Sequence, residues 1–386
     1  MTMSFETLAL VVVLGLAGPL LAAPKRLTLP IVIGELAAGA IFGRTGFDVL
    51  HTNDATFTFL ADVGFALVMF VAGTHVPLRD PRVINGLRSG VVRLVLVAAA
   101  AAALGVGIAA AFGTGHAVLY AVLMASSSAA LVLPVVDSLG LSGDAVLAMV
   151  PQVALADTIC IVALPLAIDP KHAGRAALGA CAVIAACAVI YLGLRWIQKS
   201  GRLDRLDDLS SRRKLELELR ISLVLVFAVA ALATWTHVSI MLAGFGCGLA
   251  VAAIGEPEQL ASQLFAVADG FFAPLFFVWL GASINLRELG IHPAMIGVGV
   301  ALGAGALAAH LVPVLLRQPP LVSVLSSGQL GVPIGAATLG EQLHLLKPGE
   351  ASALLLGAVL TVGAVTVAGI VLSRQAGERP PAPQTL

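Results

Sequence analysis

Long apolar stretches recur along the whole chain, and they constrain the fold more than any other feature. They lie at about residues 5–23, 29–43, 57–75, 85–112, 116–139, 143–168, 173–198, 214–236, 238–254, 258–285, 290–316, 319–342 and 348–373. An α-helix crosses a bilayer with about 20 apolar residues, and helices satisfy their own backbone polar groups in lipid. Only 11% of the residues are charged, against about 25% in soluble domains. We therefore predict an all-α polytopic membrane protein with about 13 transmembrane helices.

The distribution of loop charge predicts the orientation. With the N-terminus outside, the inner loops hold fifteen Lys and Arg residues and the outer loops hold five. Cytoplasmic loops carry the excess of basic residues, so we expect a multi-pass protein of the cell (inner or plasma) membrane with its C-terminus in the cytoplasm. The membrane domain is predicted to span residues 1–376, and the Pro-rich residues 377–386 are expected to form a disordered tail.

Asp157 is a carboxylate with apolar sequence for about ten residues on either side. A charge at the centre of a bilayer costs roughly 2.5–3.5 kcal/mol or more. Membrane proteins accept this cost mainly where the group binds a proton, an ion or a partner charge. Asp157 therefore predicts an ion or proton site.

Two apolar stretches share an internal interruption. Residues 126–134 carry three serines before Pro134, and residues 326–333 carry Ser326, Ser327, Gly328 and Gln329 before Pro333. Seven segments separate them, so the two halves have opposite topology, which is typical of inverted repeats with discontinuous helices around a transport site. Small polar residues also occur wherever membrane helices pack closely. The pairing of the two motifs, with Asp157 on the segment after the first, favours a site.

Five short segments match the helices of a known family in the right order. They are residues 29–39 (Leu-Pro-Ile-Val-Ile-Gly-Glu-Leu-Ala-Ala-Gly), 64–73, 126–134, 154–164 and 271–281. In them the chain resembles the monovalent cation:proton antiporter superfamily, the bacterial sodium/proton antiporters and potassium-efflux transporters. The resemblance covers nearly the whole chain.

That resemblance implies the sodium/proton antiporter fold, with two crossed discontinuous helices. It implies a homodimer in membrane lipid, in which a mobile core (helices at about 85–168 and 290–373) moves against a scaffold and dimer domain. By position, Asp157 matches the aspartate at which cation and proton compete. Ser127 and Ser128 match polar residues of the unwound segment.

Three positions depart from the family pattern. Members carry a polar residue before the aspartate, where this chain has Ala156. Electrogenic members place a lysine in the helix that corresponds to residues 290–316, which contain no Lys or Arg. The second crossed helix often reads Arg-Gly-Glu, whereas this chain has Ser327, Gly328 and Gln329. The losses leave one site carboxylate, so we expect one cation exchanged for one proton without net charge movement.

A carboxylate suits antiport because it offers oxygens to a hard cation when ionised and is neutral when protonated. Asp157 is thus expected to hold Na⁺ or K⁺ transiently, with Ser127, Ser128 and Thr158 contributing hydroxyls. Possible access-path residues are Glu35, Asp62 and Asp269. Gln152 lies five residues before Asp157, on another helical face, and no direct role is expected for it. His310 is expected to be a packed, hydrogen-bonded histidine rather than a pH sensor.

Other functional classes have weaker support. The sequence contains no catalytic or phosphate-binding motif, so neither an enzyme nor a cofactor is expected. The net charge of zero gives no footprint for nucleic acid. An uncoupled cation channel or uniporter on the same scaffold stays open as an alternative, because pairing groups are missing. A non-transporting membrane sensor is the third reading, although a sensor usually carries a signalling domain.

Overall fold

The computed structural model describes residues 3–23, 31–74, 81–169, 173–200, 217–236, 238–255 and 266–377, and within these ranges every regular element is helical. The elements are α1 (Phe5–Gly15), α2 (Ala17–Ala22), α3 (Ile31–Phe42), α4 (Ala55–Thr74), α5 (Pro81–Phe112), α6 (Ala117–Ala125), α7 (Ala129–Ser138), α8 (Asp144–Ile168), α9 (Ala173–Lys199), α11 (Leu217–Trp235), α12 (Ile240–Ala252), the π-helix η2 (Ala268–Phe272), α14 (Ala273–Ser283), α15 (Leu286–Ile291), α16 (Pro293–Leu311), the 3₁₀-helix η3 (Val312–Leu316), α17 (Pro320–Leu325), α18 (Gly331–Gln342) and α19 (Glu350–Gly377). Eight candidate spans are long and apolar enough to cross a membrane, and three shorter apolar helices accompany them. The predicted all-α polytopic architecture is confirmed.

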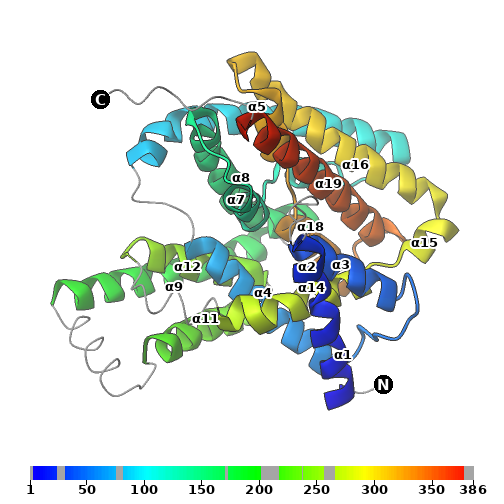
Figure 1. Ribbon diagram of the computed structural model, residues 1–386, viewed down its shortest axis with the longest axis horizontal. Coiled ribbons are helices and arrows are strands. Elements are labelled where there is room, and N and C mark those ends of the chain that lie inside the picture. Colours follow the sequence, from blue (N-terminus) through cyan, green and yellow to red (C-terminus); the bar gives the residue numbers. More distant parts are fainter. Residues whose placement is uncertain are drawn as a thin grey trace.

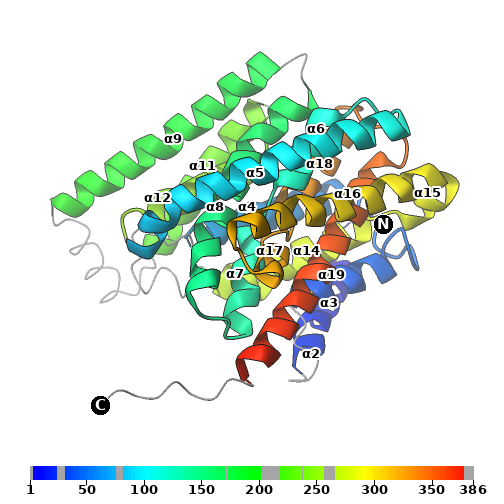
Figure 2. The same cartoon turned by 90° about the horizontal axis from the view of Figure 1, so that it is seen from above.

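The helices form two groups. Figure 1 shows α5, α8, α16 and α19 on one side of the molecule and α4, α9, α11 and α12 on the other. Within the first group, α5 packs against α6 and α8, and α16 packs against α19; within the second, α4 packs extensively against α12, and α3 against α14. Figure 2 shows α5 and α9 running obliquely in the same direction, as spans of one bilayer would. The first group contains the residues predicted to form the core, and its movement as a unit stays a prediction.

Both predicted helix interruptions are present. The first separates α6 from α7 at residues 126–128, and the second separates α17 from α18 at residues 326–330. Ser126 has an extended backbone (φ −72°, ψ 148°), which ends α6. Each broken pair is preceded and followed by a long helix, α5 and α8 in one case and α16 and α19 in the other. This shared order is the repeat that the two sequence motifs predicted.

Prolines account for three further irregularities within predicted single segments. A proline lacks the N–H that would bond to the carbonyl four residues earlier, and its ring crowds that carbonyl. Pro19 accordingly follows the division of residues 5–23 into α1 and α2, Pro274 follows the π-helical turn η2, and Pro313 lies in η3 after α16. In each case the span is continued by a second helical piece.

Helices α3 and α14 approach closely through glycines. A Cβ added to Gly39 would lie 2.1 Å from the carbonyl oxygen of Val278, and one added to Gly281 would lie 2.1 Å from that of Leu36. Small residues let membrane helices approach backbone to backbone, where dispersion contacts are strongest. The Gly-Glu-Leu segment is therefore a packing surface in this structure.

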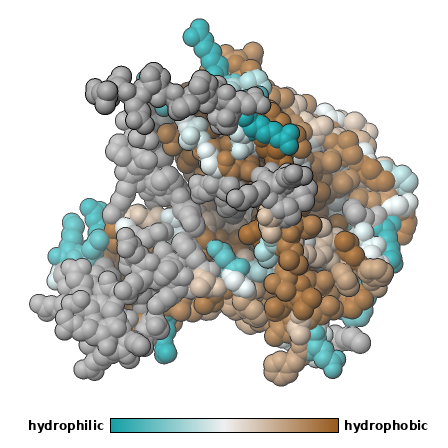
Figure 3. All heavy atoms as spheres, in the orientation of Figure 1, coloured by the Kyte–Doolittle hydropathy of each residue, from teal (hydrophilic) through white to brown (hydrophobic). Residues whose placement is uncertain are grey.

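The face of the molecule in Figure 3 is largely apolar. Hydrophobic residues cover most of its described surface, and most hydrophilic residues lie toward its margins. Large hydrophobic side chains such as Leu178, Val189 and Val367 are exposed. A lipid environment satisfies such a surface, because lipid tails are as apolar as these side chains.

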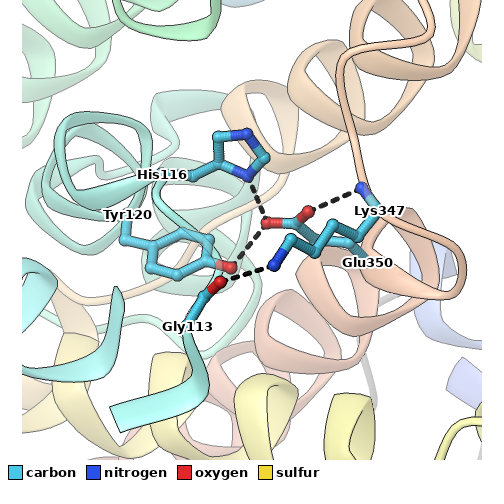
Figure 4. Close-up of polar contacts among 5 residues, drawn as sticks. All are labelled: Gly113, His116, Tyr120, Lys347 and Glu350. Atoms are coloured by element: carbon cyan, nitrogen blue, oxygen red, sulfur yellow. Dashed lines mark hydrogen bonds and ion pairs between the residues drawn. The ribbon is translucent and has the colours of Figure 1, made fainter. Parts of the chain in front are cut away.

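A buried glutamate joins the start of the first broken helix to the loop after the second (Figure 4). Glu350, at the start of α19, is fully buried. Its Oε1 accepts hydrogen bonds from His116 Nδ1 at 2.7 Å and the Tyr120 hydroxyl at 2.5 Å, and its Oε2 accepts one from the Lys347 amide at 2.8 Å. The Lys347 ammonium donates to the carbonyl of Gly113. No motif in the sequence predicts this cluster.

Some predictions fall at or beyond the limits of the described residues. Helix α19 continues to Gly377, which was assigned to the tail; residues 378–386 are not described. Lys25, Arg26, Arg79 and the part of the basic loop within 201–216 also lie outside the described residues, as do the first two residues of the 29–39 segment.

Candidate functional site

Asp157 lies in the middle of α8 and points at the first helix break. Its side chain is buried, and its Oδ2 accepts a hydrogen bond of 2.7 Å from the amide of Ala129. Ala129 is the first residue of α7. The first amides of a helix have no intrahelical partner, and the helix dipole favours an anion there. The carboxylate therefore caps the N-terminus of a half-helix.

The two breaks are hydrogen-bonded directly to each other. The amide of Ser128 donates to the carbonyl of Gly328 at 2.7 Å, and the hydroxyl of Ser127 donates to the carbonyl of Ser326 at 2.5 Å. These bonds satisfy carbonyls that the interruption of α17 and α18 leaves without helical partners. The structure thus brings together the Ser127–Ser128 pair and the second-repeat residues that the sequence singled out.

Gln329 ties the second break to the end of α6. Its side-chain amide donates to the carbonyl of Leu123 at 2.6 Å, in the last turn of α6. Its backbone amide donates to the hydroxyl of Thr361 on α19 at 3.2 Å. A donor at a helix C-terminus complements the negative end of the dipole, so the two halves of the first broken helix are capped oppositely, one by Asp157 and one by Gln329. Thr361 was missed, and its only signal was a polar residue in an apolar run.

Several buried polar atoms near the breaks have no partner among the described residues. They include Ser128 Oγ, Gln152 Oε1 and Ser323 Oγ. A buried polar group without a hydrogen bond costs free energy, of order 1–3 kcal/mol. Such atoms call for an explanation, and oxygens of this kind are suitable ligands for a hard cation. Ser128 Oγ is the closest of them in sequence to the Ala129–Asp157 contact.

Gln152, for which no direct role is expected, lies against the second break, and a role for it stays untested. Gln152 is buried, and its amide lies 3.4 Å from the hydroxyl of Ser326 in donor geometry. The prediction compared faces of one helix, but α8 contacts both α7 and α17. Two residues on different faces of α8 can therefore both reach the crossing, which is the place where the breaks at residues 126–128 and 326–330 meet.

His310 is packed and hydrogen-bonded, as predicted. It is 1% exposed, near the end of α16, with Nδ1 3.0 Å from the carbonyl of Ala306 and Nε2 3.2 Å from the hydroxyl of Ser127. Its contact with the first break was not anticipated, because the partners are 183 residues apart.

Two other predicted hydroxyls are directed into their own helical turns. Thr158 Oγ1 donates to the carbonyl of Ala154 at 2.8 Å, and its side chain is half-buried. Ser327 Oγ donates to the carbonyl of Val324 at 2.7 Å. The hydrogen of each hydroxyl is therefore engaged locally, and a role for Thr158 at the carboxylate stays a prediction.

The predicted access-path residues lie in the other group of helices. Glu35 is buried in α3, Asp62 is half-buried in α4, and Asp269 is exposed in η2. None belongs to the hydrogen-bonded crossing described above. Their role on a path stays a prediction.

The donor set suits a transient ion better than a resident metal. Within the described ranges, no group of three or more His, Cys, Asp or Glu residues is placed to hold a metal ion. What the crossing offers is one carboxylate, serine hydroxyls and backbone carbonyls. Such oxygen ligands suit a hard cation.

Comparison with known proteins gives consistent matches. The model of the family described as "Sodium/hydrogen exchanger, transmembrane" matches residues 9–377. The putative Na(+)/H(+) antiporter YjbQ of Bacillus subtilis is 22% identical over 380 residues, which cover 92% of this chain and 61% of that protein. Na(+)/H(+) antiporter NhaS5 of Synechocystis is 24% identical, over 82% of this chain and 46% of that protein. The chain thus spans less than two thirds of either relative.

A third relative and a solved structure match over most of their length. Probable Na(+)/H(+) antiporter 3 of Methanocaldococcus jannaschii is 24% identical over 83% of this chain and 85% of that protein. The structure of the sodium proton antiporter MjNhaP1 from the same organism superimposes with a TM-score of 0.60 at 16% identity, covering 97% of this chain and 96% of that one. At that identity the match shows the fold.

Proposed function

The chain belongs to the sodium/hydrogen exchanger family, and we propose that it is a secondary active transporter that exchanges a monovalent cation, Na⁺ or K⁺, for protons. The observation that carries the proposal is the placement of Asp157. One buried carboxylate lies against the start of a half-helix, at the point where two interrupted helices cross. The relatives named as Na⁺/H⁺ antiporters support the same activity.

Exchange follows from mutually exclusive occupation of Asp157. The amide of Ala129 holds Oδ2, which accepts that bond whether the group is ionised or protonated. Oδ1 then takes either a proton or a cation. Ser128 Oγ, which has no other described partner, and backbone carbonyls freed by the breaks complete the cation's oxygen shell. Either occupant neutralises the carboxylate, which lowers the cost of carrying it through a low-dielectric region.

The exchange is one for one and moves no net charge. Ala156 supplies no second acid beside Asp157, and α16 carries no Lys or Arg. One carboxylate alternates between one cation and one proton, so each cycle returns the same charge. Flux in proteoliposomes should therefore be unchanged by an imposed membrane potential. A current that grows with voltage would contradict the stoichiometry.

Alternating access uses the two helix groups. The group with α5–α8 and α16–α19 carries the crossing and moves as the core, whereas the group with α4, α9, α11, α12 and α14 is the scaffold and forms the homodimer contact. The protein lies in a cell membrane, with its N-terminus outside and its C-terminus in the cytoplasm, in agreement with the loop charges. Cross-linking of the purified protein in lipid tests the dimer.

The activity is tested by proton movement in everted vesicles. In vesicles with the wild-type protein, addition of Na⁺, K⁺ or Li⁺ should dissipate an imposed proton gradient, which a pH-sensitive dye reports. Asp157→Asn should abolish this response. Asp144→Asn is the matched control, because Asp144 is an exposed residue at the start of the same helix. Normal exchange by Asp157→Asn would refute the proposal.

The same vesicles separate the channel reading. The absence of an Asp partner at Ala156 and of a basic residue in α16 favours it as the second candidate. An uncoupled channel would pass the cation without changing the proton gradient. If the cation moved without any movement of protons, the protein would be a channel and not an exchanger.

A further inference from the structure

Helix α17 has an apolar side and a polar side, although it packs inside the first helix group. It contacts α8, α16 and α19, and Figure 2 shows it among these helices. Val322 and Leu325 belong to a buried apolar cluster with residues of α7, α8 and α19. Ser323 and Ser326 are one turn apart, so their side chains share another face. A helix buried within a protein is ordinarily apolar all round, so the polar side calls for an explanation.

Three side chains on this side have polar atoms without a partner among the residues that the structure describes. The atoms are Ser323 Oγ, Gln152 Oε1 and both amide atoms of Gln318, and each side chain is at most 2% exposed. Ser326 and Ser327 donate their hydroxyl hydrogens to carbonyls of their own turns, whereas the Ser323 hydroxyl has no such bond in the described chain. An unbonded buried polar atom costs about 1–3 kcal/mol, so four would cost about 4–12 kcal/mol, as much as the whole stability of an ordinary domain. A ligand that bonds to these atoms would remove this cost.

The three side chains, which we call the polar row, are arranged in order between one end of the first helix group and the crossing. Gln318 stands between two exposed residues just before α17. Ser323 follows at roughly 8 Å along the axis, and Ser326 at about 4.5 Å more. Ser326 Oγ lies 3.4 Å from Gln152 Nε2. One water with two hydrogen bonds of about 2.8 Å spans about 5.6 Å, so one or two waters would bridge each interval.

The polar row continues to Asp157 through the first break. The carbonyl of Ser326 accepts the hydroxyl of Ser127. The next residue is Ser128, whose Oγ also has no described partner. The amide of Ala129 follows, and it is bonded to Asp157. Polar groups therefore succeed one another from the surface beside Gln318 to the carboxylate.

Water fits the polar row better than an alkali cation does. Hydroxyl and amide groups both donate and accept hydrogen bonds, and a buried water makes two to four of them. The polar row contains no carboxylate, so a cation held there would be a buried charge without a partner. Waters joined by hydrogen bonds pass a proton from one to the next, so no hydrated ion has to enter. The ligand that the polar row predicts is therefore bound water.

We propose that water bonds to the polar row and forms a proton route between Gln318 and Asp157, separate from the path of the cation. The proton-carrying part rests on the proposed exchange activity. When a cation binds, the proton that leaves Asp157 bonds to a water, which passes one of its own protons to the next water. Each water ends with as many protons as it had, and one proton is released beside Gln318. In the orientation proposed above, this end faces the cytoplasm.

Hydration is tested without any transport measurement, by X-ray hydroxyl-radical footprinting of the full chain in lipid. Radiolysis turns bound water into hydroxyl radicals, which oxidise an adjacent thiol, and mass spectrometry locates the product. Ser323→Cys puts a thiol at the polar row, and Val322→Cys is the matched control, 2% exposed in the apolar cluster. We expect oxidation at position 323 to be about tenfold faster than at 322, because bound water adjoins only the first. The native Cys247, 1% exposed in α12, should react as slowly as the control. Equal rates at the two positions, or no oxidation at 323, would overturn the proposal.

The proton-carrying part is tested by exchange in proteoliposomes. Valine and threonine have the same shape, but only threonine keeps the hydroxyl. We expect Ser323→Val to lower the maximal rate about tenfold, the rate equivalent of one lost hydrogen bond, with an unchanged apparent KM for Na⁺. Ser323→Thr should stay close to the wild-type rate.

Two outcomes of this comparison would contradict a separate proton route. Equal rates in Ser323→Val and Ser323→Thr would show that the hydroxyl plays no part. A raised KM for Na⁺ in Ser323→Val alone would place Ser323 on the path of the cation. If Asp157→Asn also exchanged normally, the proposed function would fail, while the footprinting result on the polar row would stand by itself.

Discussion

Removing the buried carboxylate of Glu350 should destabilise the protein more than any conservative change at that position. Glu350→Ala deletes the acceptor of three hydrogen bonds, from His116, Tyr120 and Lys347. Leaving a buried donor without its acceptor costs about 1–3 kcal/mol, so three donors give about 3 kcal/mol at the lower end. The His116 side chain is 24% exposed, so water partly replaces its lost partner. We therefore expect the lower end, about 3 kcal/mol.

Glu350→Gln separates the charge from the hydrogen-bond geometry. Its carbonyl oxygen can still accept from His116 and Tyr120, but its amide NH₂ faces the Lys347 N–H, donor against donor. One bond is lost, at a cost of about 1–2 kcal/mol. Both variants are measured by reversible unfolding in mixed micelles, with Glu6→Ala, an exposed residue of α1, as the control. A loss below about 1 kcal/mol for Glu350→Ala, or equal losses for Ala and Gln, would refute the reasoning.

Three further predictions concern packing, capping and pH. Gly39→Ala should lower stability in the same unfolding assay by about 1–3 kcal/mol, because its methyl group would overlap the α14 backbone, whereas Gly107→Ala, with nothing within 4 Å, should be neutral or slightly stabilising. Gln329→Glu replaces the donor at the last turn of α6 with an acceptor, so vesicle exchange should fall about tenfold or more, the rate equivalent of one lost hydrogen bond; wild-type exchange would exclude a capping role. The backbone amide of Phe57 donates to the Asp54 carboxyl and is the main reason that the pKa of this carboxyl lies below its ordinary value. The stabilising effect of ionised Asp54 is therefore present at neutral pH and is lost as pH falls through the lowered pKa. Asp54→Asn should flatten the acid side of the plot of stability against pH, and an unchanged plot would contradict this assignment.

The helix breaks could be predicted from sequence because their cause is local. Small polar residues followed by Pro134 and Pro333 interrupt apolar runs, and the breaks lie where the motifs lie. Asp157 was conspicuous for the same reason, as one charge in a long apolar segment.

The contacts among distant residues could not be predicted in this way. Glu350 stands at the edge of an apolar stretch, where a solvated helix start is the ordinary expectation, and its partner Tyr120 is 230 residues away. Gln152 was judged against Asp157 alone, although its partner Ser326 belongs to the other repeat. Only the packing of α8 between two broken helices shows which faces matter.

Two adjacent amides of the first break are committed to different partners. That of Ser128 is bonded to the other repeat through Gly328, and that of Ala129 is bonded to Asp157. Two successive peptide units therefore connect the carboxylate of Asp157 to the second helix break. Asp157, the first break and the second break must then move together. We expect the distances among Asp157, Ser128 and Gly328 to stay constant while their depth relative to α4 and α12 changes.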